Sequence, residues 1–558
     1  MAVTRSVLVV ALAITVLLGL RRLLRIGKRA SGLPPGPPTI PILGNLHLVP
    51  ARDAHLQFQK WAQEYGPIYS LMLGTKTFIV LSSDTAVKDL LDRRSNIYSS
   101  RPDMFIGMDL ASGGLRILLM KYGSTWRMIH KMIHNILNIK AAVTYVPYQD
   151  LENKFMLQGL LDQPAEFANH IRRYTNSLTT QMVFGFRTLS INDPKLQQLF
   201  RATSQGFEHW GEVAGSAAAQ ILDLFPALQR LPSYLVPNYR HAQRLHKKEK
   251  QLYMGHWLKA KTGIRNGTVM PCFCVDLMKA QEKEGFSDDL AGYTSGSLLE
   301  AGSDTTAATL IGFVQAMTVF PEVQKKAQEE IDRIVGNGRM PTMEDASNMP
   351  YIRGCVKESL RWMPTNILGV PHSLIRDDEY MGYKIPEGAS VIMNVWTIHM
   401  NAENFPDPRK FDPDRFKDDE LSLFESATTS DPQKLMTRSF VFGAGRRLCQ
   451  GMHIAERSLF LAMARMLWAF SFTKAVDGHG KPITPDINDL TQGLFVLPAP
   501  FQSIIEPRSG KHAEMIRQAW GESKDTLLHP ETGQWIKVPD GMLFSTYEPS
   551  KDITMNEM

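Results

Sequence analysis

Residues 442–451, FGAGRRLCQG, place Cys449 in a loop of glycine and positive charge. The glycines of this loop predict a tight turn whose backbone amides point inward. Small and apolar residues then recur at three- and four-residue spacing from 455 to 467, which predicts a helix with one buried face. The chain must therefore fold so that a thiol lies at the N-terminus of a core helix.

Two chemistries suit a thiol in this setting. The helix dipole, the backbone amides and the guanidinium groups of Arg446 and Arg447 are all expected to lower the pKa of Cys449. A stabilised thiolate is either a nucleophile or a ligand for a soft metal. His453 lies four residues further on and could act as the base of a nucleophile. The loop alone leaves both possibilities open.

A second unusual stretch, EAGSDTTAA, interrupts a long helix predicted from residue 287 to Phe320. Glycine within a helix costs about 1 kcal/mol relative to alanine, so Gly302 needs a compensating reason. Glycine permits the close approach of a bulky partner, and Asp304 with Thr305 adds an acid and a hydroxyl that can relay protons. A helix kink with a solvated aspartate explains the same residues.

Two short motifs carry charged residues that could form a structural clamp. Glu358 and Arg361 lie one helical turn apart in VKESLRW, and Arg415 lies in FDPDRF. Any surface helix can carry such a pair. A network of Glu358 with both arginines would instead form a bidentate structural clamp.

The charge distribution points to a membrane at the N-terminus. The formal net charge is +6, and residues 1–29 contain six basic and no acidic residues, so the remainder is balanced. This balance argues against a nucleic-acid-binding face. Residues 6–20 are uncharged and mostly apolar, and the basic residues after them disfavour translocation. We therefore expect a retained signal-anchor rather than a cleaved signal peptide, with the following domain cytosolic. Four cysteines in the whole chain agree with a reducing compartment.

The predicted fold class is mainly α with a smaller β region, preceded by one N-terminal transmembrane helix. Residues 68–83 predict a β-hairpin, and the prolines between 34 and 41 predict a semi-rigid spacer. We expect the following regions: a signal-anchor with a basic flank at 1–26, a proline-rich hinge at 27–45, the main domain at 46–506 and a C-terminal extension at 507–558. In the extension, residues 511–528 predict an amphipathic helix packed on the surface.

The ordered motifs together resemble the cytochrome P450 family of haem-thiolate monooxygenases. FGAGRRLCQG resembles the haem loop of that family, AGSDTT its oxygen-activating helix, ESLR its Glu-x-x-Arg pair and PDRF its arginine-bearing meander. The resemblance covers residues 33–505. The anchor and hinge are similar to those of membrane-bound eukaryotic members. The residues in and around the motifs resemble those of fungal members that act in secondary metabolism.

The resemblance implies heme b (iron protoporphyrin IX) as the cofactor. Cys449 would be the axial iron ligand, and Asp304 with Thr305 would deliver protons for oxygen activation. Contacts with the haem are implied for Trp126, His130, Ala301, Gly302, His372, Phe442, Gly443, Arg447 and Gly451. His130 departs from the family pattern, which commonly has an arginine four residues after that tryptophan, and the charge of a histidine depends on pH.

Substrate contacts are also implied by the resemblance. The segments concerned include residues 200–220, and the apolar candidates elsewhere are Phe105, Ile106, Met108, Ile367, Leu368 and Phe495. Together they indicate a mostly apolar small molecule.

The electrons must come from another protein, because no G-x-G-x-x-G fingerprint for flavin or nicotinamide is visible. We expect NADPH to supply them through a separate NADPH–cytochrome reductase. Arg446, His453 and Arg457 could dock such an acidic partner. The location implied is the endoplasmic reticulum membrane, with a single pass and a cytosolic catalytic domain.

The predicted function is O2-dependent hydroxylation or other oxidation of an intermediate in fungal natural-product or mycotoxin biosynthesis. The alternative is a haem-thiolate enzyme for ring coupling, desaturation or isomerisation without net hydroxylation. The Asp304–Thr305 pair favours oxygen activation, and a non-catalytic haem sensor would not need it. A thiol hydrolase would leave the other motifs unexplained.

Overall fold

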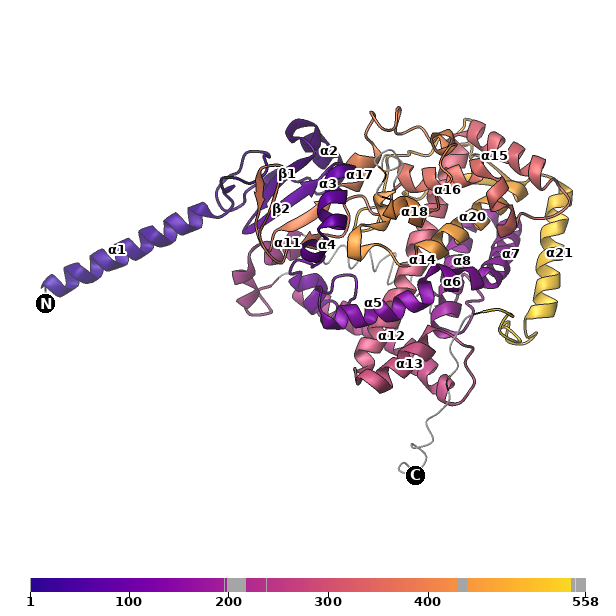
Figure 1. The fold of residues 1–558 in the computed structure, drawn as a ribbon, viewed down its shortest axis with the longest axis horizontal. Helices are drawn as coiled ribbons and strands as arrows, with labels where there is room; N and C mark the ends of the chain where they lie inside the picture. The colour runs from indigo at the N-terminus through magenta and orange to yellow at the C-terminus, as the bar shows by residue number, and fades with distance from the viewer. Residues whose placement is uncertain are drawn as a thin grey trace, which may run out of the picture.

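Helices make up most of the molecule, and the strands β1 (Ile68–Leu73) and β2 (Lys76–Leu81) lie on the side from which the N-terminal helix leaves (Figure 1). The computed structural model describes residues 2–194, 196–197, 217–236, 238–429, 431, 439–542 and 547. The helices are α1 (Ala2–Arg25), α2 (Ala54–Tyr65), α3 (Asp84–Val87), α4 (Ser95–Tyr98), α5 (Ser124–Leu137), α6 (Ile139–Thr144), α7 (Val146–Asp162), α8 (Phe167–Phe184), α11 (Ala217–Leu224), α12 (Tyr239–Arg265), α13 (Phe273–Glu284), α14 (Asp288–Val319), α15 (Pro321–Ile334), α16 (Pro350–Trp362), α17 (Val395–His399), α18 (Leu423–Thr428), α20 (Met452–Ala469) and α21 (Gly510–Leu527). Short helical turns used below are η3 (Phe105–Leu110), η7 (Pro413–Phe416), η8 (Phe440–Phe442) and η9 (Gly445–Arg447).

The largest sheet has the strand order β1-β2-β6-β3. Its strands are β1 (Ile68–Leu73), β2 (Lys76–Leu81), β3 (His372–Ser373) and β6 (Ser390–Met393). The first two form the expected antiparallel hairpin, whereas β6 joins β2 in parallel. Two smaller antiparallel pairs are β4 (Asp378–Tyr380) with β5 (Tyr383–Ile385) and β7 (Phe470–Lys474) with β8 (Ser503–Pro507). The mainly helical prediction with a small sheet region is confirmed.

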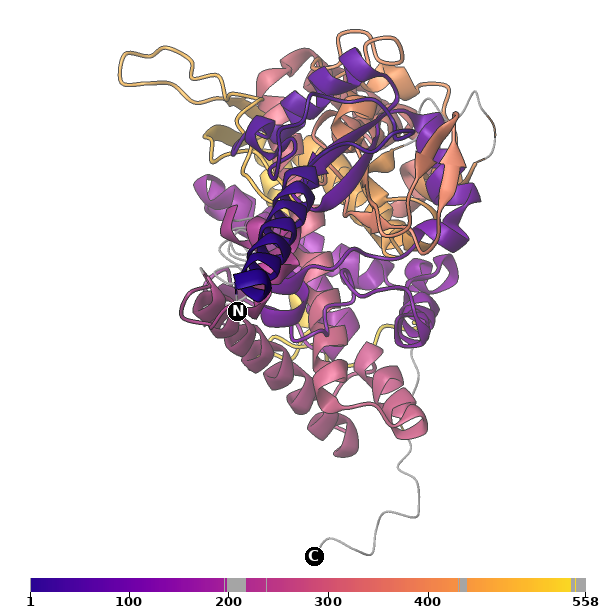
Figure 2. The same cartoon turned by 90° about the vertical axis from the view of Figure 1, so that its left-hand side faces the viewer.

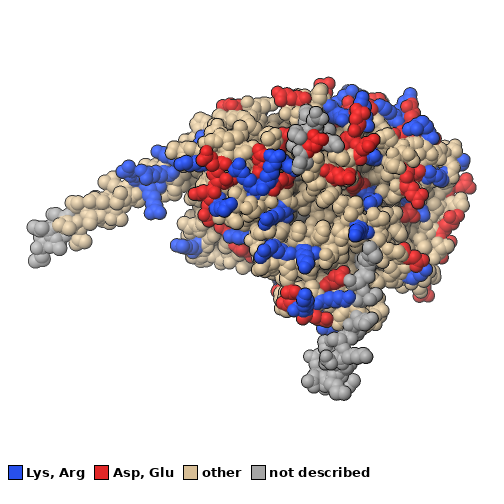
Figure 3. Space-filling view, viewed as in Figure 1, with Lys and Arg blue, Asp and Glu red and all other residues tan. Residues whose placement is uncertain are grey.

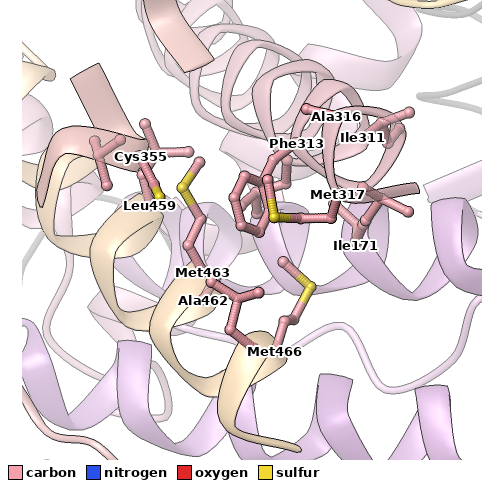
Figure 4. Packing of buried hydrophobic residues seen from close by; sticks show 14 of the residues in the cluster. Ile171, Ile311, Phe313, Ala316, Met317, Cys355, Leu459, Ala462, Met463 and Met466 are labelled. Carbon is pink, nitrogen blue, oxygen red and sulfur yellow. The ribbon is translucent and has the colours of Figure 1, made fainter. Parts of the chain in front are cut away.

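The central core lies between α14 and α20. Met463 and Met466 of α20 extend toward Phe313 and Met317 of α14, and all four side chains are fully buried (Figure 4). Unbranched methionine side chains fill irregular space between helices, so they hold two long helices together without strict shape matching. The stripe predicted after Cys449 is therefore the face that joins α20 to the core.

The ends of α14 lie where the sequence predicts them. Ser287 accepts a hydrogen bond from the backbone N–H of Leu290, which caps the first turn. Asp288 and Asp289 add negative charge at the positive end of the helix dipole. The helix ends before Pro321, which begins α15, because a residue before proline is disfavoured in helical conformation.

The N-terminal helix α1 projects away from the body (Figures 1 and 2). Its apolar side chains are exposed, with Leu8 and Leu12 each 66% accessible. Within the described ranges, no single helix has the length and apolar composition that a membrane span requires; the bent pair α14–α15 meets the test by composition only. The transmembrane helix therefore stays a prediction.

Hydrogen bonds from Arg29 hold the segment after α1 against the sheet. The guanidinium of Arg29 donates to the Ser70 hydroxyl of β1 (2.9 Å) and to the carbonyls of Gly36 and Pro37 (2.9 Å each). The proline-rich residues thus lie along β1 and determine where α1 leaves the domain.

The C-terminal extension packs on the surface, as the sequence predicts. The Trp520 ring of α21 stacks on Phe155 of α7, with 4.4 Å between centroids. Further along, Trp535 donates from its indole N–H to Gln181 of α8 (2.6 Å), and the carbonyl of Gly533 accepts from Arg187 (2.6 Å). Because Trp535 is only 7% exposed, the extension completes the core beside α7 and α8.

Candidate active site

Glycine geometry shapes the loop that carries Cys449. Gly443 and Gly445 have positive φ values of 82° and 58°, which favour glycine. A Cβ at Gly445 would lie 1.9 Å from the carbonyl oxygen of Leu91, so no other residue fits there. The backbone N–H of Cys449 donates to the carbonyl of Phe442 (2.8 Å), which closes the turn before α20.

The chemistry of the Cys449 thiol differs from the sequence-based expectation. Cys449 is exposed, whereas the three other cysteines of the chain are buried. Protein atoms nevertheless surround its sulfur closely, so burial raises the pKa of the thiol, and the backbone hydrogen bond at Gly451 opposes this only in part. The prediction that the neighbouring arginines lower this pKa is wrong, because both guanidinium groups bind other partners. A raised pKa disfavours the free thiolate, and a metal ion bound at the sulfur would stabilise it.

The nucleophile alternative also needs a base at the sulfur. The ring of His453 packs against Phe424, with 4.8 Å between centroids. Among the hydrogen bonds of the described residues, none joins His453 to Cys449. His453 therefore does not form the base–thiol pair of a hydrolase.

Arg447 begins a buried group of cations next to the loop. Its side chain donates to the carbonyls of Ser99 (2.8 Å) and Met120 (2.7 Å), and the guanidinium lies 4.2 Å from the centroid of the Trp126 ring. Burial lowers the pKa of Arg447 to about 10. The ring of His130 lies tilted against Trp126, with 4.5 Å between centroids. Burial lowers the pKa of His130 too.

Arg101 adds a second cation, and His372 adds a neutral imidazole, to complete the cationic cluster. Arg101 is 5% exposed and donates to the carbonyls of Val370 (2.6 Å), Pro371 (2.7 Å) and Leu118 (3.0 Å). Burial and then the charge of Arg447 lower its pKa. The imidazole of His372, bonded through Nδ1 to the Tyr98 carbonyl (2.8 Å), has a pKa of about 3 because of burial and both arginines. A histidine at this pKa is neutral.

The cationic cluster fits the anionic edge of a haem. The largest influences on the pKa values of Arg101, His130, His372 and Arg447 include no carboxylate. Buried charges are normally paired, because an unpaired ion in a low-dielectric interior is costly. Two propionates would supply the missing negative charge. Trp126, His130, His372 and Arg447 are thus brought together as predicted, and Arg101 joins them.

The turn of α14 at residues 301–305 is fixed by α8. Ala301 is exposed, and the Thr305 hydroxyl donates to its carbonyl (3.0 Å). The carbonyl of Ser303 accepts from the Thr175 hydroxyl of α8 (2.6 Å). Asp304 and Thr305 are both half-buried.

The small size of Gly302 has a different cause from the one that the sequence suggests. A Cβ at this position would lie 2.5 Å from the hydroxyl oxygen of Thr179 in α8. The close approach is therefore between α14 and α8, and Gly302 faces that contact. Of the two predicted small residues, Ala301 supplies the open surface.

The predicted clamp is present. Arg361 donates to both carboxylate oxygens of Glu358 (2.6 and 2.7 Å), and Arg415 lies 3.4 Å from the same carboxylate. Glu358 is completely buried and also accepts from the backbone N–H of Asp412 (2.8 Å). The clamp therefore joins α16 to the segment that leads into η7.

One histidine connects the clamp with the cysteine loop. Arg361 donates to the carbonyl of His399 (2.9 Å), and His399 Nε2 accepts from the backbone N–H of Phe440 at the start of η8 (3.0 Å). Burial lowers the pKa of His399 to about 3, so its ring is neutral and can accept. Sequence reasoning missed His399 and Arg101, since neither lies at a diagnostic spacing from a motif.

Comparison with known proteins agrees with this geometry. The family model for Cytochrome P450 matches residues 34–505. The chain belongs to the cytochrome P450 family. Cytochrome P450 monooxygenase virE of Hypocrea virens is 53% identical, and the alignment covers 96% of each chain. The monooxygenase fogE of Aspergillus ruber is 50% identical over 96% of this chain and 98% of its own. The monooxygenase fsoB of Humicola fuscoatra is 48% identical over 94% of this chain and 95% of its own. The chain is accordingly a P450 monooxygenase, and its cofactor is haem.

The apolar candidates for the substrate pocket of this P450 divide into two groups. Phe105 and Met108 are partly buried in one cluster that also contains Val370 and Leu494. Leu368 and Phe495 are likewise partly buried. Ile106 (0% exposed) and Ile367 (9%) are packed within core clusters, which corrects their assignment to the pocket. The predicted segment 200–220 lies outside the described residues except for its last four positions.

Adjacent arginines allow a matched test of the haem-edge assignment. Replacing Arg447 with leucine removes an inward-facing cation, whereas Arg446 is exposed and donates to the Tyr122 hydroxyl (2.8 Å). Hydrogen bonds to charged groups contribute about 1.5–3 kcal/mol each, so Arg447→Leu should weaken haem retention by about 10- to 100-fold. Haem transfer to excess apomyoglobin measures retention. Arg446→Leu serves as the control, and equal transfer rates for both variants would contradict the assignment.

Proposed function

We propose that this P450 uses O2 and electrons from a separate NADPH–cytochrome reductase to hydroxylate or otherwise oxidise a mostly apolar small molecule of fungal secondary metabolism. The observation that carries oxygen insertion is the Asp304–Thr305 pair on the half-open turn of α14, next to exposed Ala301. Haem held by the Cys449 thiolate supplies the O2 chemistry, and electron donation from sulfur favours O–O cleavage. The Thr305 hydroxyl would donate a proton from this turn, and the Asp304 carboxyl would resupply the proton to Thr305.

The chemistry of the pocket cluster supports an apolar substrate. Phe105, Met108, Val370 and Leu494 contribute aromatic, thioether and aliphatic surface from three separate segments of the chain. Ligand sites of this kind bind by burying apolar surface, and a few polar groups set the orientation. The fungal monooxygenases at 48–53% identity support a role in fungal metabolism.

The surface over α5 supports docking of an acidic reductase. This helix contains no acidic residue, and Arg127 and Lys131 are exposed on it. Figure 3 shows basic side chains over this region. Arg446 is exposed beside it, whereas His453 and Arg457 are half-buried, so Arg446 is the better placed of the three predicted contacts. Opposite charge on the reductase would steer the encounter.

A second exposed apolar region supports membrane attachment. Leu231, Tyr234 and Leu235 are 43%, 71% and 55% exposed. Helix α11, which precedes this segment, is held beside the β1–β2 turn, where the backbone N–H of Thr75 donates to the carbonyl of Leu224 (3.1 Å). The chain after α1 docks on the same sheet, so α1 and this segment lie on one side of the molecule (Figure 1). We propose a single pass in the endoplasmic reticulum membrane, with the catalytic domain cytosolic.

Thiolate ligation can be tested by the carbon monoxide spectrum. The reduced, haem-loaded protein should give a strongly red-shifted Soret band with carbon monoxide, because only a thiolate ligand produces that shift. Cys449→Ser should bind haem without the band. The buried Cys355, replaced by serine, is the matched control and should retain it. A wild-type protein that is folded and haem-loaded but lacks the band would refute thiolate ligation.

The proton-delivery role is tested by Thr305→Ala. The variant should keep the carbon monoxide band but release more hydrogen peroxide per NADPH, because protons no longer reach the site in time. Product formation should fall by about 10²-fold, at the low end of general acid–base contributions. A deletion strain complemented with each variant reports the product by metabolite profiling. Thr306→Ala is the control, and normal coupling in Thr305→Ala would remove Thr305 from the relay.

Membrane attachment can be tested with two changes made separately and together. Deletion of residues 1–26 should lower the membrane-bound fraction but leave residual binding through the second apolar region. Replacing Leu231, Tyr234 and Leu235 with serine in the deletion variant should abolish that remainder, since each buried apolar side chain contributes about 1.5–3 kcal/mol. Flotation with phospholipid vesicles measures the fraction. Equal flotation of the full-length and doubly changed proteins would overturn the proposal.

A further inference from the structure

A buried arginine that does not belong to the cationic cluster bridges two glutamates from different helices. Arg116 is 2% exposed and donates to Glu249 of α12 (2.7 Å) and to Glu300 of α14 (2.5 Å). Glu249 and Glu300 are 3% and 6% exposed. The Tyr253 hydroxyl donates to the second oxygen of Glu300. These four side chains form the α12–α14 ion cluster.

The α12–α14 ion cluster holds the loop that carries the pocket candidates. Arg116 also donates from Nε to the Ser112 hydroxyl (3.0 Å), and that hydroxyl donates to the carbonyl of Gly107 (2.8 Å). Gly107 lies within η3, between Phe105 and Met108. A continuous set of hydrogen bonds therefore runs from two helices to the backbone beneath the pocket side chains.

The same cluster touches the catalytic turn of α14. Glu300 directly precedes Ala301, and Asp304 follows four residues later, one turn along the same helix face. A shift of Arg116 would therefore act on both the pocket loop and the segment next to the haem. We find no second group in the described ranges that joins these two parts in this way.

The charges of the cluster do not balance when both glutamates are ionised. One guanidinium faces two carboxylates, which leaves one negative charge in the interior. Burial and the charge of Glu300 raise the pKa of Glu249 to about 7, although Arg116 opposes the shift. Near neutral pH, Glu249 therefore gains or loses a proton while it lies beside Arg116.

The other ionisable groups around the cluster have partners of their own. From α14, Tyr293 bonds to His246 Nδ1 of α12 (2.6 Å). Burial, followed by the charge of Lys250, lowers the pKa of His246, and burial raises the pKa values of Tyr253 and Tyr293. Lys250 pairs with Asp289 (2.5 Å), with both side chains well exposed. Glu249 is therefore the group of this set that changes charge near neutrality.

We propose that Arg116, Glu249 and Glu300 are positioning residues that hold the 105–116 loop against α12 and α14, and that ionisation of Glu249 loosens the loop and its hold on the substrate. The inference rests on the proposed function only in taking Phe105 and Met108 as pocket residues.

The direction of the pH dependence follows from the linkage between proton binding and folding. An acid whose pKa is raised by folding stabilises the protonated fold, and this contribution is lost as pH rises from the unfolded value of about 4.3 through the folded value.

Hydrogen exchange of the full-length holoenzyme tests the proposal. After correction for intrinsic rates, backbone protection of residues 105–116 should fall by up to about tenfold per pH unit as the pH rises toward the folded pKa of Glu249, and should level off above it. Glu249→Gln should keep the loop protected and independent of pH, because glutamine remains neutral. Arg116→Met should lose protection at every pH. It should also bind 4-phenylimidazole at least about tenfold more weakly while binding imidazole normally, as judged by the Soret shift.

A second buried glutamate provides the matched control. Glu152 lies between Arg173 (2.5 Å) and Arg187 (2.6 Å), and these arginines lower its pKa, so Glu152→Gln should reduce stability without changing the pH profile of the loop. The proposal is overturned if Glu249→Gln keeps the wild-type pH dependence. It is equally overturned if Arg116→Met exchanges in the loop like the control. Failure of the haem-thiolate function would appear in the wild-type carbon monoxide band, which the exchange readout does not use.

Discussion

The buried carboxylate of Glu358 is the interaction on which the catalytic architecture depends. It binds Arg361, Arg415 and the backbone of Asp412, and Arg361 extends the contact to His399. Removing one partner of a buried ion pair costs about 3–5 kcal/mol, because the other charge remains in the interior. Since His399 then binds the backbone before the cysteine loop, the position of Cys449 depends on groups distant from it in sequence.

The buried charge clusters differ in whether side chains of the protein itself neutralise their charge. Glu358 and Glu152 each have two arginines, and further backbone or amide partners satisfy them. Arg101 and Arg447 donate hydrogen bonds to carbonyl oxygens, and the charge of Arg447 lowers the pKa of Arg101. The first kind is structural, while the second calls for an anionic ligand. Charge balance thus separates scaffold from cofactor site without reference to conserved motifs.

The sequence is sufficient for features that depend on local spacing. The hairpin at 68–83, both ends of α14 and the glycine turn before Cys449 all follow from residues close together in the chain. It is insufficient where the partner is remote. The contact of Gly302 with Thr179, the role of Arg101 and the burial of Ile106 depend on packing between segments more than a hundred residues apart or on a loop's final position.

The pKa of the Cys449 thiol shows how a local sequence pattern can mislead about the electrostatics of a side chain. Arginines beside a cysteine in sequence suggest an activated thiolate, but Arg446 and Arg447 direct their charges to Tyr122 and Trp126. Burial then leaves Cys449 with a raised pKa, which would make a poor free nucleophile. A bound iron reverses this penalty, because coordination stabilises the thiolate directly. The same burial that disfavours hydrolase chemistry therefore suits an axial ligand that is charged only when the metal is in place.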